Sequence, residues 1–366
     1  MTAGGLKDRL SSSPEHMFLG ARRVGEGEDT YFIAEIGNNH NGDFFLAKRL
    51  IEEAARAGAD AVKLQKRSVE DTFARELRES SQTRNEIAGR TYGEYREKLE
   101  LDLDAFLSLK EVAVDNGVSF FATPFDVPSV DFLERVEVPF YKVASFDVTN
   151  IPLLDYVAAI GKPIILSTGM STAAEVTQAV DTILAHHDRI VLLHCVSMYP
   201  TPDEHANLAA MQWLKQEFHP LPVGYSGHEE DILPTLVAVA QGASVVERHL
   251  TLSRSLPGPD HGTVSVEPET FREMVGSARR IRTLSGTAVK RISPEEEKRR
   301  NKHGKSVVAA SAIARGTVIT EDMLAVKSPG YGIKPGRRHE LVGCIAAIDI
   351  EADAVLRPEY LQLPEN

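Results

Sequence analysis

The stretch FFLAKRLIEEAARAGADAVKLQ, at Phe44–Gln65, decides the fold class of this chain. Apolar residues recur at spacings of three and four over Phe44–Asp60, which predicts an amphipathic helix. The stripe consists of Leu46, Leu50, Ile51 and Ala54. Gly58 follows the stripe, as a glycine at the end of a helix does. The apolar run Ala61–Gln65 then predicts a buried strand, so the stretch reads as a helix leading directly into a strand.

The same alternation continues from Thr30 to Leu250. Eight apolar runs predict strands, at Tyr31–Glu35, Ala61–Gln65, Ser119–Ala122, Tyr141–Ser145, Pro163–Ser167, Ile190–Cys195, Val223–Ser226 and Ser244–His249. Continuous apolar strands that alternate with amphipathic helices predict a parallel sheet covered by helices. Eight such units in about 250 residues predict an α/β fold of the (β/α)8 TIM-barrel type. A doubly wound open sheet is the alternative, but EIGNNHNG after the first strand does not match GxGxxG.

The pattern changes after Gly286 and divides the chain into four parts. Residues 1–29 form an N-terminal extension, and residues 30–288 form the barrel. Residues 289–304 are charged and poor in apolar side chains, which predicts a linker. Residues 305–366 carry short β-like runs separated by turns, and they predict a small β-rich domain.

Composition restricts the class of protein and its partners. The chain has 366 residues and a formal charge of −12, from 41 Lys and Arg against 53 Asp and Glu, which argues against nucleic acid. The basic run Lys298–Lys305 reads as part of the solvated linker, with a polyanion patch as the alternative. No apolar run reaches the roughly 20 residues of a membrane span, and the N-terminus does not resemble a secretory signal. Only two cysteines, Cys195 and Cys344, indicate a reducing cytoplasm.

Two histidines end neighbouring predicted strands. One imidazole, His228, ends the motif GYSGH (Gly224–His228), and the other, His249, lies in SVVERHL (Ser244–Leu250). In such barrels the C-terminal ends of the strands form the active site. Glu247 precedes His249 by two residues, so both side chains point to one face of the strand. Two imidazoles and a carboxylate suit a divalent metal such as Mn or Zn. The alternative is that each histidine is an ordinary core or surface residue.

Two lysines lie inside otherwise apolar predicted strands. Burying the charged amines of Lys63 and Lys142 costs free energy unless each meets an anion. Together with hydroxyls at other strand ends, the two lysines predict a pocket for a phosphate and a carboxylate. The remaining strand-end residues are Glu35, Gln65, Thr123, Ser145, Ser167, Ser197 and Ser226. A metal-assisted carbon–carbon bond formation on a phosphorylated anion explains lysines and histidines together. A Schiff-base aldolase using Lys142 or Lys63 is a second hypothesis. A non-catalytic binding barrel is a third.

These segments closely resemble the N-acetylneuraminate (sialic acid) synthase family. The matching stretches are FIAEIGNNHNG (Phe32–Gly42), AVKLQ (Ala61–Gln65), FFATPFD (Phe120–Asp126), YKVAS (Tyr141–Ser145), GKPIILSTGM (Gly161–Met170), LLHCVSMYPTP (Leu192–Pro202), GYSGH (Gly224–His228), ERHLT (Glu247–Thr251) and PGPDH (Pro257–His261). The segment Ser306–Leu363 resembles the antifreeze-like (SAF) domain that follows the barrel in that family. The resemblance covers essentially everything after residue 30, in order.

The resemblance implies a transferase that condenses phosphoenolpyruvate with the aldehyde of an open-chain amino sugar. The products would be a 2-keto-3-deoxy sugar acid and inorganic phosphate. By the same resemblance, His228 and His249 would bind a divalent ion, Mn²⁺ before Mg²⁺ or Co²⁺. Phosphoenolpyruvate would be held by Lys63, Thr123, Lys142, Ser145, Ser167 and Ser226. The sugar side would be lined by Glu35, Gln65, Tyr199 and Asp260, with Glu35 and Glu247 as acid and base. A domain-swapped, cytoplasmic homodimer is also implied.

Three positions depart from the sialic acid synthase pattern. Ser328 replaces the family arginine that contacts the N-acetyl group, Asp147 replaces a glutamate, and Ser197 replaces an asparagine on the phosphoenolpyruvate side. A serine hydroxyl does not replace the planar, charged guanidinium of an arginine, so the identity of the acceptor sugar is not fixed by the resemblance. The candidate acceptors are therefore N-acetylmannosamine, a legionaminic or pseudaminic acid precursor, and another aldose. The segment Thr83–Leu101 is expected to help shape the sugar pocket.

Overall fold

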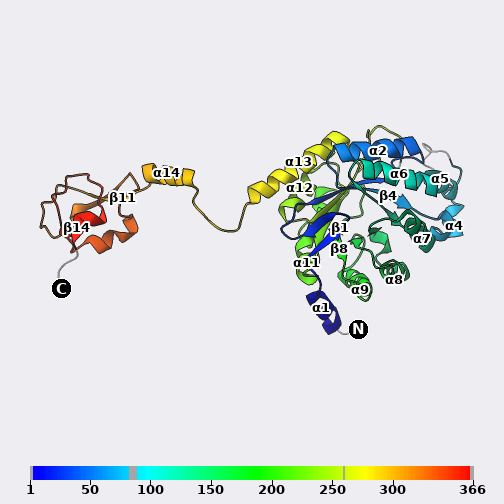
Figure 1. Cartoon of the computed structure of the whole chain (residues 1–366), viewed down its shortest axis with the longest axis horizontal. Helices are drawn as coiled ribbons and strands as arrows, with labels where there is room; N and C mark the ends of the chain where they lie inside the picture. The colour runs from blue at the N-terminus through cyan, green and yellow to red at the C-terminus, as the bar shows by residue number, and fades with distance from the viewer. Residues whose placement is uncertain (1–2, 82–88, 259, 363–366) are drawn as a thin grey trace. The chain divides into compact units, whose positions relative to one another are not determined.

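The computed structural model describes residues 3–81, 89–258 and 260–362 (Figure 1). The chain divides into two compact units, Met1–Gly286 and Thr287–Asn366, and each is described by itself. Within the described residues, no helix combines the length and the apolar composition needed to cross a membrane.

The first unit is a nearly closed parallel barrel, which confirms the predicted fold class. Its strands follow the order β5-β4-β3-β10-β9-β8-β7-β6, and β5 and β6 lie next to each other. The strands are β3 (Tyr31–Gly37), β4 (Ala61–Lys66), β5 (Ser119–Pro124), β6 (Tyr141–Val143), β7 (Ile164–Ser167), β8 (Ile190–Cys195), β9 (Val223–Gly227) and β10 (Val245–His249). Hydrogen-bonded neighbours in this order are parallel, so all eight C-terminal ends meet at one face.

Helices surround the strands. The longer ones are α2 (Phe44–Arg56), α5 (Tyr92–Leu99), α6 (Leu103–Asp115), α7 (Val127–Val136), α8 (Ile151–Ala159), α9 (Ala173–Leu184), α11 (Ala210–Glu217), α12 (Leu233–Ala240) and α13 (Pro268–Ser285). Single turns occur at α3 (Val69–Thr72), α4 (Arg75–Arg78), η1 (Ser145–Asp147) and α10 (Asp203–Ala206). The arrangement places helices outside and strands inside, as the alternating sequence pattern predicts.

Helix α2 shows how the sequence produces one of these units. The Asp43 carboxylate accepts a hydrogen bond from the Leu46 amide at 3.0 Å and so caps the N-terminus. Ala47, Leu50, Ile51 and Ala54 are buried, whereas Leu46 of the predicted stripe is only partly buried. Gly58 has φ of 95°, a left-handed conformation that favours glycine, and the chain then enters β4.

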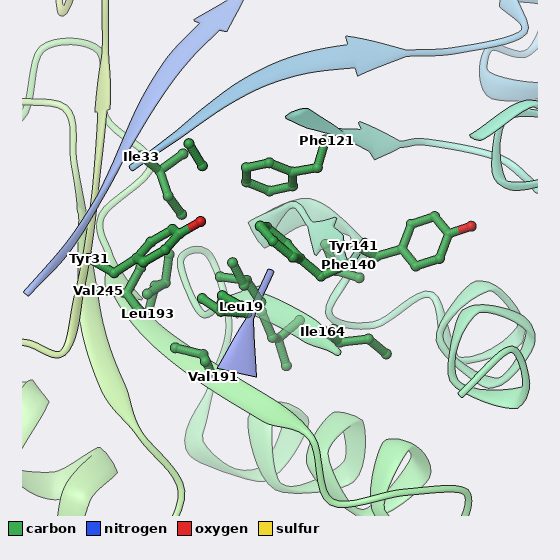
Figure 2. Packing of buried hydrophobic residues seen from close by; sticks show 14 of the residues in the cluster. Leu19, Tyr31, Ile33, Phe121, Phe140, Tyr141, Ile164, Val191, Leu193 and Val245 are labelled. Carbon is green, nitrogen blue, oxygen red and sulfur yellow. The ribbon is translucent and has the colours of Figure 1, made fainter. Parts of the chain in front are cut away.

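The N-terminal segment closes one end of the barrel. Helix α1 (Ala3–Ser11) precedes an antiparallel hairpin of β1 (His16–Leu19) and β2 (Arg22–Gly25). Leu19 is fully buried and lies among side chains from the first residues of several barrel strands (Figure 2). The labelled neighbours include Tyr31, Phe140, Ile164 and Val245. The hairpin therefore covers the N-terminal end of the barrel, opposite the strand ends that hold the candidate site.

The second unit is small and has its own core. Its strands are β11 (Ser306–Ala309), β12 (Leu324–Lys327), β13 (Ile345–Ala346) and β14 (Leu361–Gln362), paired antiparallel. Turns η2 (Glu321–Met323), η3 (Pro335–Leu341) and η4 (Pro358–Tyr360) connect them. Helix α14 (Pro294–His303) occupies the segment predicted as a linker. A capping box between Ser293 and Glu296, with acids in the first turn and bases in the last, explains why it is helical.

Candidate active site

A cavity of about 400 Å³ lies at the C-terminal ends of the barrel strands. Fourteen of the sixteen residues predicted for the site line it: Glu35, Lys63, Gln65, Thr123, Lys142, Ser145, Ser167, Ser197, Tyr199, Ser226, His228, Glu247, His249 and Asp260. Side chains two residues apart on a strand point to the same face, and this explains why two pairs of these residues line the cavity together. Lys63 and Gln65 share one face of β4, and Glu247 and His249 share one face of β10.

The centre of the cavity holds alternating charges. Lys63 Nζ lies 3.0 Å from Glu35 Oε2 and 3.7 Å from Glu247 Oε1, and it donates a hydrogen bond to Thr123 Oγ1 at 2.9 Å. Lys142 Nζ lies 4.0 Å from Glu247 Oε1 and donates to the Val143 carbonyl at 2.9 Å. All four charged side chains are buried. Because buried charges are costly without partners, the two lysines and the two carboxylates stabilise one another in the interior.

Burial and neighbouring charges separate the pKa values of these groups. Burial raises the pKa of Glu35 above its usual value, and the nearby Glu247 charge adds to the rise. Burial would raise the pKa of Glu247 as well, but Lys142 and Lys63 outweigh it and lower that pKa. Burial lowers the pKa of Lys142. The pKa of Lys63 is raised, because Glu247 and Glu35 overcome the opposite effect of burial.

Hydroxyl groups surround this charged centre. Ser226 Oγ donates to Glu247 Oε1 at 3.3 Å, and Ser145 Oγ accepts from the Gly169 amide at 3.0 Å. Ser167 Oγ is buried and has no hydrogen-bond partner among the described residues, so it is available to bind a ligand. A Cβ at Gly169 would lie 2.5 Å from Ser197 Oγ and 2.8 Å from Ser145 Oγ. Glycine is therefore required where β7 and β8 approach each other.

His228 and His249 form the candidate metal position. Their ring centroids lie 5.4 Å apart, and the Tyr199 ring stacks on His228 at 4.1 Å. His228 Nδ1 donates to the Val196 carbonyl at 2.9 Å, which leaves Nε2 with a free lone pair. His249 Nδ1 is buried and, in the part of the chain that the structure describes, has no hydrogen-bond partner; burial lowers the pKa of His249 to about 4. The pKa of His228 is raised, because Cys195 and the Val196 carbonyl overcome the opposite effect of burial. Burial therefore favours the neutral, metal-binding form of His249, whereas His228 must lose its proton to act as a ligand.

The metal position is incomplete as a protein site. Among the described residues, no group of three or more His, Cys, Asp or Glu side chains is arranged to hold a metal ion. The two imidazoles fit a divalent ion as a partial ligand set. The remaining ligands would have to come from substrate or water, as they do in open catalytic sites.

A second buried hydrogen-bond network lies on the side of β10 that faces away from the cavity. Arg248 lies between Glu247 and His249 on β10 and points to the opposite side of the strand, away from the cavity. Its Nη1 donates to Glu229 Oε1 at 2.9 Å and its Nη2 donates to the Glu229 carbonyl at 2.7 Å. Nη1 also reaches the Asp231 carbonyl and Thr235 Oγ1. Arg248 thus fixes the loop that directly follows His228.

Among the described residues, Asp147 does not line the cavity, and Ser328 lies in the second unit, which is described by itself. Asp147 is buried in the turn η1, where its Oδ1 accepts a hydrogen bond from Asn150 Nδ2 at 3.1 Å. Burial raises the pKa of Asp147 to about 6. Ser328 belongs to the second unit and its Oγ donates to the His303 carbonyl at 3.2 Å. Pro259 of the PGPDH motif lies outside the described residues.

The cavity contains residues that the sequence analysis missed. They are Asn38, Arg67, Thr72, Phe73, Tyr92, Arg96, Phe125, Ala144, Phe146, Met170 and Cys195. Arg67 continues the alternation of Lys63 and Gln65, so its position carried a usable signal. Tyr92 and Arg96 belong to the segment Thr83–Leu101, which was expected to shape the pocket, although residues 82–88 lie outside the described part. Cys195 Sγ lies 3.8 Å from His228 Nδ1.

One histidine beside the cavity predicts how stability depends on pH. Burial lowers the pKa of His40 to about 4, and the nearby Arg67 and His261 lower it further, against the opposite effects of Asp43 and the Gly37 backbone. His40 Nδ1 accepts a hydrogen bond from the Gly42 amide at 3.0 Å, which requires an unprotonated Nδ1. The folded state therefore favours the neutral ring.

Acidification is expected to destabilise the protein through His40. The unfolded state takes up a proton near pH 6.5 and the folded state only near pH 4, so this contribution is complete above pH 6.5 and is lost toward pH 4. The loss is about 3 kcal/mol, at about 1.4 kcal/mol per pH unit. Denaturant unfolding of the wild type and a His40→Gln variant across this range measures it. If the free energy of unfolding changed with pH in the same way in both proteins, His40 would not be the cause of this pH dependence.

The fold and the cavity define the class of this protein. A parallel β/α barrel with convergent charged side chains at its C-terminal strand ends is an architecture that carries enzyme active sites. The chain belongs to the NeuB family, whose family model matches residues 50–290. The SAF domain model matches residues 304–362, so the small second unit is an SAF domain. The predicted synthase family and the predicted SAF domain are thereby both confirmed.

Relatives of known name cover nearly the whole chain. The N,N'-diacetyllegionaminic acid synthase of Campylobacter jejuni is 39% identical over 332 residues, 90% of this chain and 99% of the relative. The human N-acetylneuraminate-9-phosphate synthase is 38% identical, covering 93% of this chain and 95% of the relative. The N-acetylneuraminic acid synthetase of Leptospira borgpetersenii, solved with citrate, is 36% identical with a TM-score of 0.69, covering 78% of this chain and 95% of the neighbour.

Proposed function

We propose that this protein condenses phosphoenolpyruvate with the aldehyde of an open-chain sugar, giving a sialic-acid-like 2-keto-3-deoxy sugar acid and inorganic phosphate. One observation carries the proposal. Two lysines, two carboxylates, two histidines and an unpartnered serine hydroxyl converge in one cavity at the strand ends. The names of the relatives, which are synthases of such acids, support the same reaction.

The protein's residues perform complementary tasks in this proposal. Lys63 and Lys142 offset the charges of phosphoenolpyruvate, and the hydroxyls of Thr123, Ser145, Ser167, Ser197 and Ser226 orient it. C3 of the enol attacks the aldehyde carbon, and the aldehyde oxygen takes up a proton. Water adds at C2 and releases a proton, and the tetrahedral intermediate then loses phosphate by C–O cleavage. Glu35 and Glu247 lie beside Lys63 and exchange these protons.

His228 and His249 are the residues that would hold a divalent ion, with Mn²⁺ the first choice. A bound ion of this kind polarises a carbonyl oxygen and so supplies Lewis-acid assistance. Tyr199 packs against both rings and limits their movement, with ring centroids 4.1 Å from His228 and 6.0 Å from His249. Gln65, Tyr199 and Asp260 remain the proposed contacts of the sugar. Homodimer formation and a cytoplasmic location also remain proposals, and sedimentation of the full chain tests the first.

Turnover is expected only with phosphoenolpyruvate, a suitable aldose and a divalent ion together. The test measures loss of phosphoenolpyruvate with Mn²⁺ across N-acetylmannosamine, the diacetamido hexoses that precede legionaminic and pseudaminic acids, and non-acetylated aldoses. Chelation is expected to abolish turnover, and Mn²⁺ is expected to restore it, because the histidines alone do not polarise the aldehyde. Turnover that persists after chelation would contradict the metal role. No turnover with any aldose would contradict the reaction.

A Schiff-base aldolase is the second candidate, and one observation favours it. Burial lowers the pKa of Lys142, and a neutral amine is the form that attacks a carbonyl. Borohydride trapping in the presence of pyruvate or an aldose separates the two reactions. Covalent labelling of Lys142 would favour the aldolase. Chelator-sensitive turnover without labelling would favour the condensation.

A further inference from the structure

Three hydrogen bonds fix the direction of the Gln65 side-chain amide. Its Oε1 accepts from Arg67 Nη2 at 2.6 Å and from Asn38 Nδ2 at 3.0 Å, and its Nε2 donates to Glu35 Oε1 at 2.9 Å. An amide oxygen has two lone pairs, and both are used here. Because the opposite orientation would turn the NH2 group toward two donors, the amide has to present an N–H to Glu35.

The Gln65 amide in turn fixes the carboxylate of Glu35. With Oε1 held by Gln65, the other carboxylate oxygen of Glu35, Oε2, faces Lys63 Nζ at 3.0 Å. The fit is close, because a Cβ at Gly37 would lie 3.1 Å from Glu35 Oε1 and 3.2 Å from Gln65 Nε2. Gly37 has φ of 56°, a conformation that also favours glycine. The two side chains therefore share a space that leaves the carboxylate little freedom to turn.

Arg67 is anchored on the sides that do not face Gln65. The residue is 6% exposed, and its guanidinium carbon lies 4.4 Å from the centroid of the Phe125 ring. Phe125 in turn stacks on Phe146, with ring centroids 5.2 Å apart. The Arg67 backbone amide donates to Glu100 Oε2 at 3.2 Å. A guanidinium is a rigid plane, so a stacked and buried arginine directs its N–H groups along fixed lines.

Pairing with Glu100 does not account for the orientation of the Arg67 guanidinium. Arg67 Nη1 lies 3.6 Å from Glu100 Oε1, and each of these atoms is buried without a hydrogen-bond partner among the described residues. Glu100 already has a closer cation, since Lys66 Nζ donates to its Oε2 at 2.9 Å. The hydrogen bond from Arg67 Nη2 to Gln65 Oε1 is much shorter, at 2.6 Å. The guanidinium is therefore oriented for the amide rather than for the carboxylate.

We propose that Arg67 is a positioning residue, which fixes the Gln65 amide and, through that amide, holds the Glu35 carboxylate in the orientation that proton exchange requires. The inference rests on the proposed condensation, in which Glu35 exchanges protons with the reacting molecules. Arg67 acts across two consecutive hydrogen bonds and does not need to touch a substrate. Without it, one donor fewer holds the amide oxygen, and a turned amide would set two acceptor oxygens against each other. The second N–H of Gln65 Nε2 stays available for the sugar.

The experiment compares kcat for Arg67→Met, Gln65→Ala and the double variant, using the full chain with phosphoenolpyruvate, Mn²⁺ and the aldose that it turns over. Arg67→Met is expected to lower kcat about 10- to 100-fold, because a small misplacement of a reacting group costs up to about 10²-fold. The KM for phosphoenolpyruvate is expected to stay nearly unchanged, since both lysines remain. If Arg67 acts through Gln65, adding Arg67→Met to Gln65→Ala lowers kcat no further, whereas independent effects multiply.

Two further variants separate positioning from a purely structural role. Arg67→Lys keeps a donor but loses the planar guanidinium, so it is expected to recover part of the rate that Arg67→Met loses. Arg75→Met is the matched control, because Arg75 is exposed and pairs with Glu79 at 2.7 Å. Unfolding curves check that each variant is folded. A purely structural role would lower the melting temperature of Arg67→Met and leave kcat below that temperature unchanged.

The Gln65 side-chain amide gives a second readout that does not need turnover. In protein whose glutamine side chains carry isotopic nitrogen, the NH2 signal that disappears in Gln65→Ala belongs to Gln65. Hydrogen exchange at that signal is expected to quicken in Arg67→Met and to keep its wild-type rate in Arg75→Met. If exchange quickens but no aldose is turned over, the proposed reaction is contradicted and the positioning of Gln65 is supported. An unchanged exchange rate in Arg67→Met, a kcat equal to that of Arg75→Met, or losses that multiply in the double variant would each overturn the inference.

Discussion

Replacing Lys63 by methionine is expected to lower kcat by at least about 10² to 10³-fold. Methionine keeps an apolar stem of similar length but removes the charge 3.0 Å from Glu35 Oε2 and the donor to Thr123. Two carboxylates would then face incoming phosphoenolpyruvate without their common cation. Because Glu35 already has a raised pKa, we expect it to bind a proton in the variant, so folding should survive better than activity.

The control for this experiment is Lys110→Met on α6. Lys110 donates to the Val136 carbonyl at 2.8 Å and is not among the residues that line the cavity. Steady-state rates with phosphoenolpyruvate as the varied substrate, together with unfolding curves, separate activity from stability. A Lys63→Met enzyme with a rate within a few-fold of Lys110→Met would show that Lys63 is structural. Chemical rescue by added alkylamines would support its electrostatic role.

Replacing Arg248 by methionine is expected to destabilise the barrel by about 3 to 5 kcal/mol. Arg248 is fully buried, and its guanidinium makes hydrogen bonds to both the carboxylate and the carbonyl of Glu229. Removal leaves the Glu229 carboxylate in the interior, paired only with the Thr235 and Tyr225 hydroxyls among its recorded partners. The melting temperature should fall by about 10 °C, at roughly 2–4 °C per kcal/mol.

A double variant distinguishes the ion pair from simple packing. Arg248→Met combined with Glu229→Gln removes both charges, and it is expected to recover part of the lost stability. Arg272→Met is the surface control, because Arg272 forms an exposed pair with Glu269, and exposed pairs contribute about 0–1 kcal/mol. Equal losses in Arg248→Met and the double variant would show that the shape of the side chain, rather than its charge, matters.

The sequence predicted the fold and most of the candidate site for one physical reason. Parallel strands share a direction, so polar residues at their C-terminal ends must converge. This geometry predicted Lys63, Lys142, His228 and His249 from the sequence alone. Helix α2 was equally predictable, because its apolar spacing and Gly58 follow local rules that tertiary packing did not override.

The remaining features depend on packing that sequence patterns do not encode. The hairpin of β1 and β2 contains alternating residues, but only tertiary contact shows that Leu19 enters the barrel. Tyr92 and Arg96 reach the cavity from a helix rather than a strand end, so the strand-end rule does not select them. Asp147 was predicted only from the resemblance, and it does not reach the cavity, because η1 directs its carboxylate to Asn150.

The buried hairpin also has a kinetic consequence. Leu19 and its neighbours fill the N-terminal end of the barrel, opposite the cavity at the C-terminal strand ends. Under the proposed reaction, the molecule that binds at Lys63 and Lys142 must arrive first, since the sugar then blocks its route. Under the proposed reaction, we therefore expect an ordered mechanism in which phosphoenolpyruvate binds before the sugar.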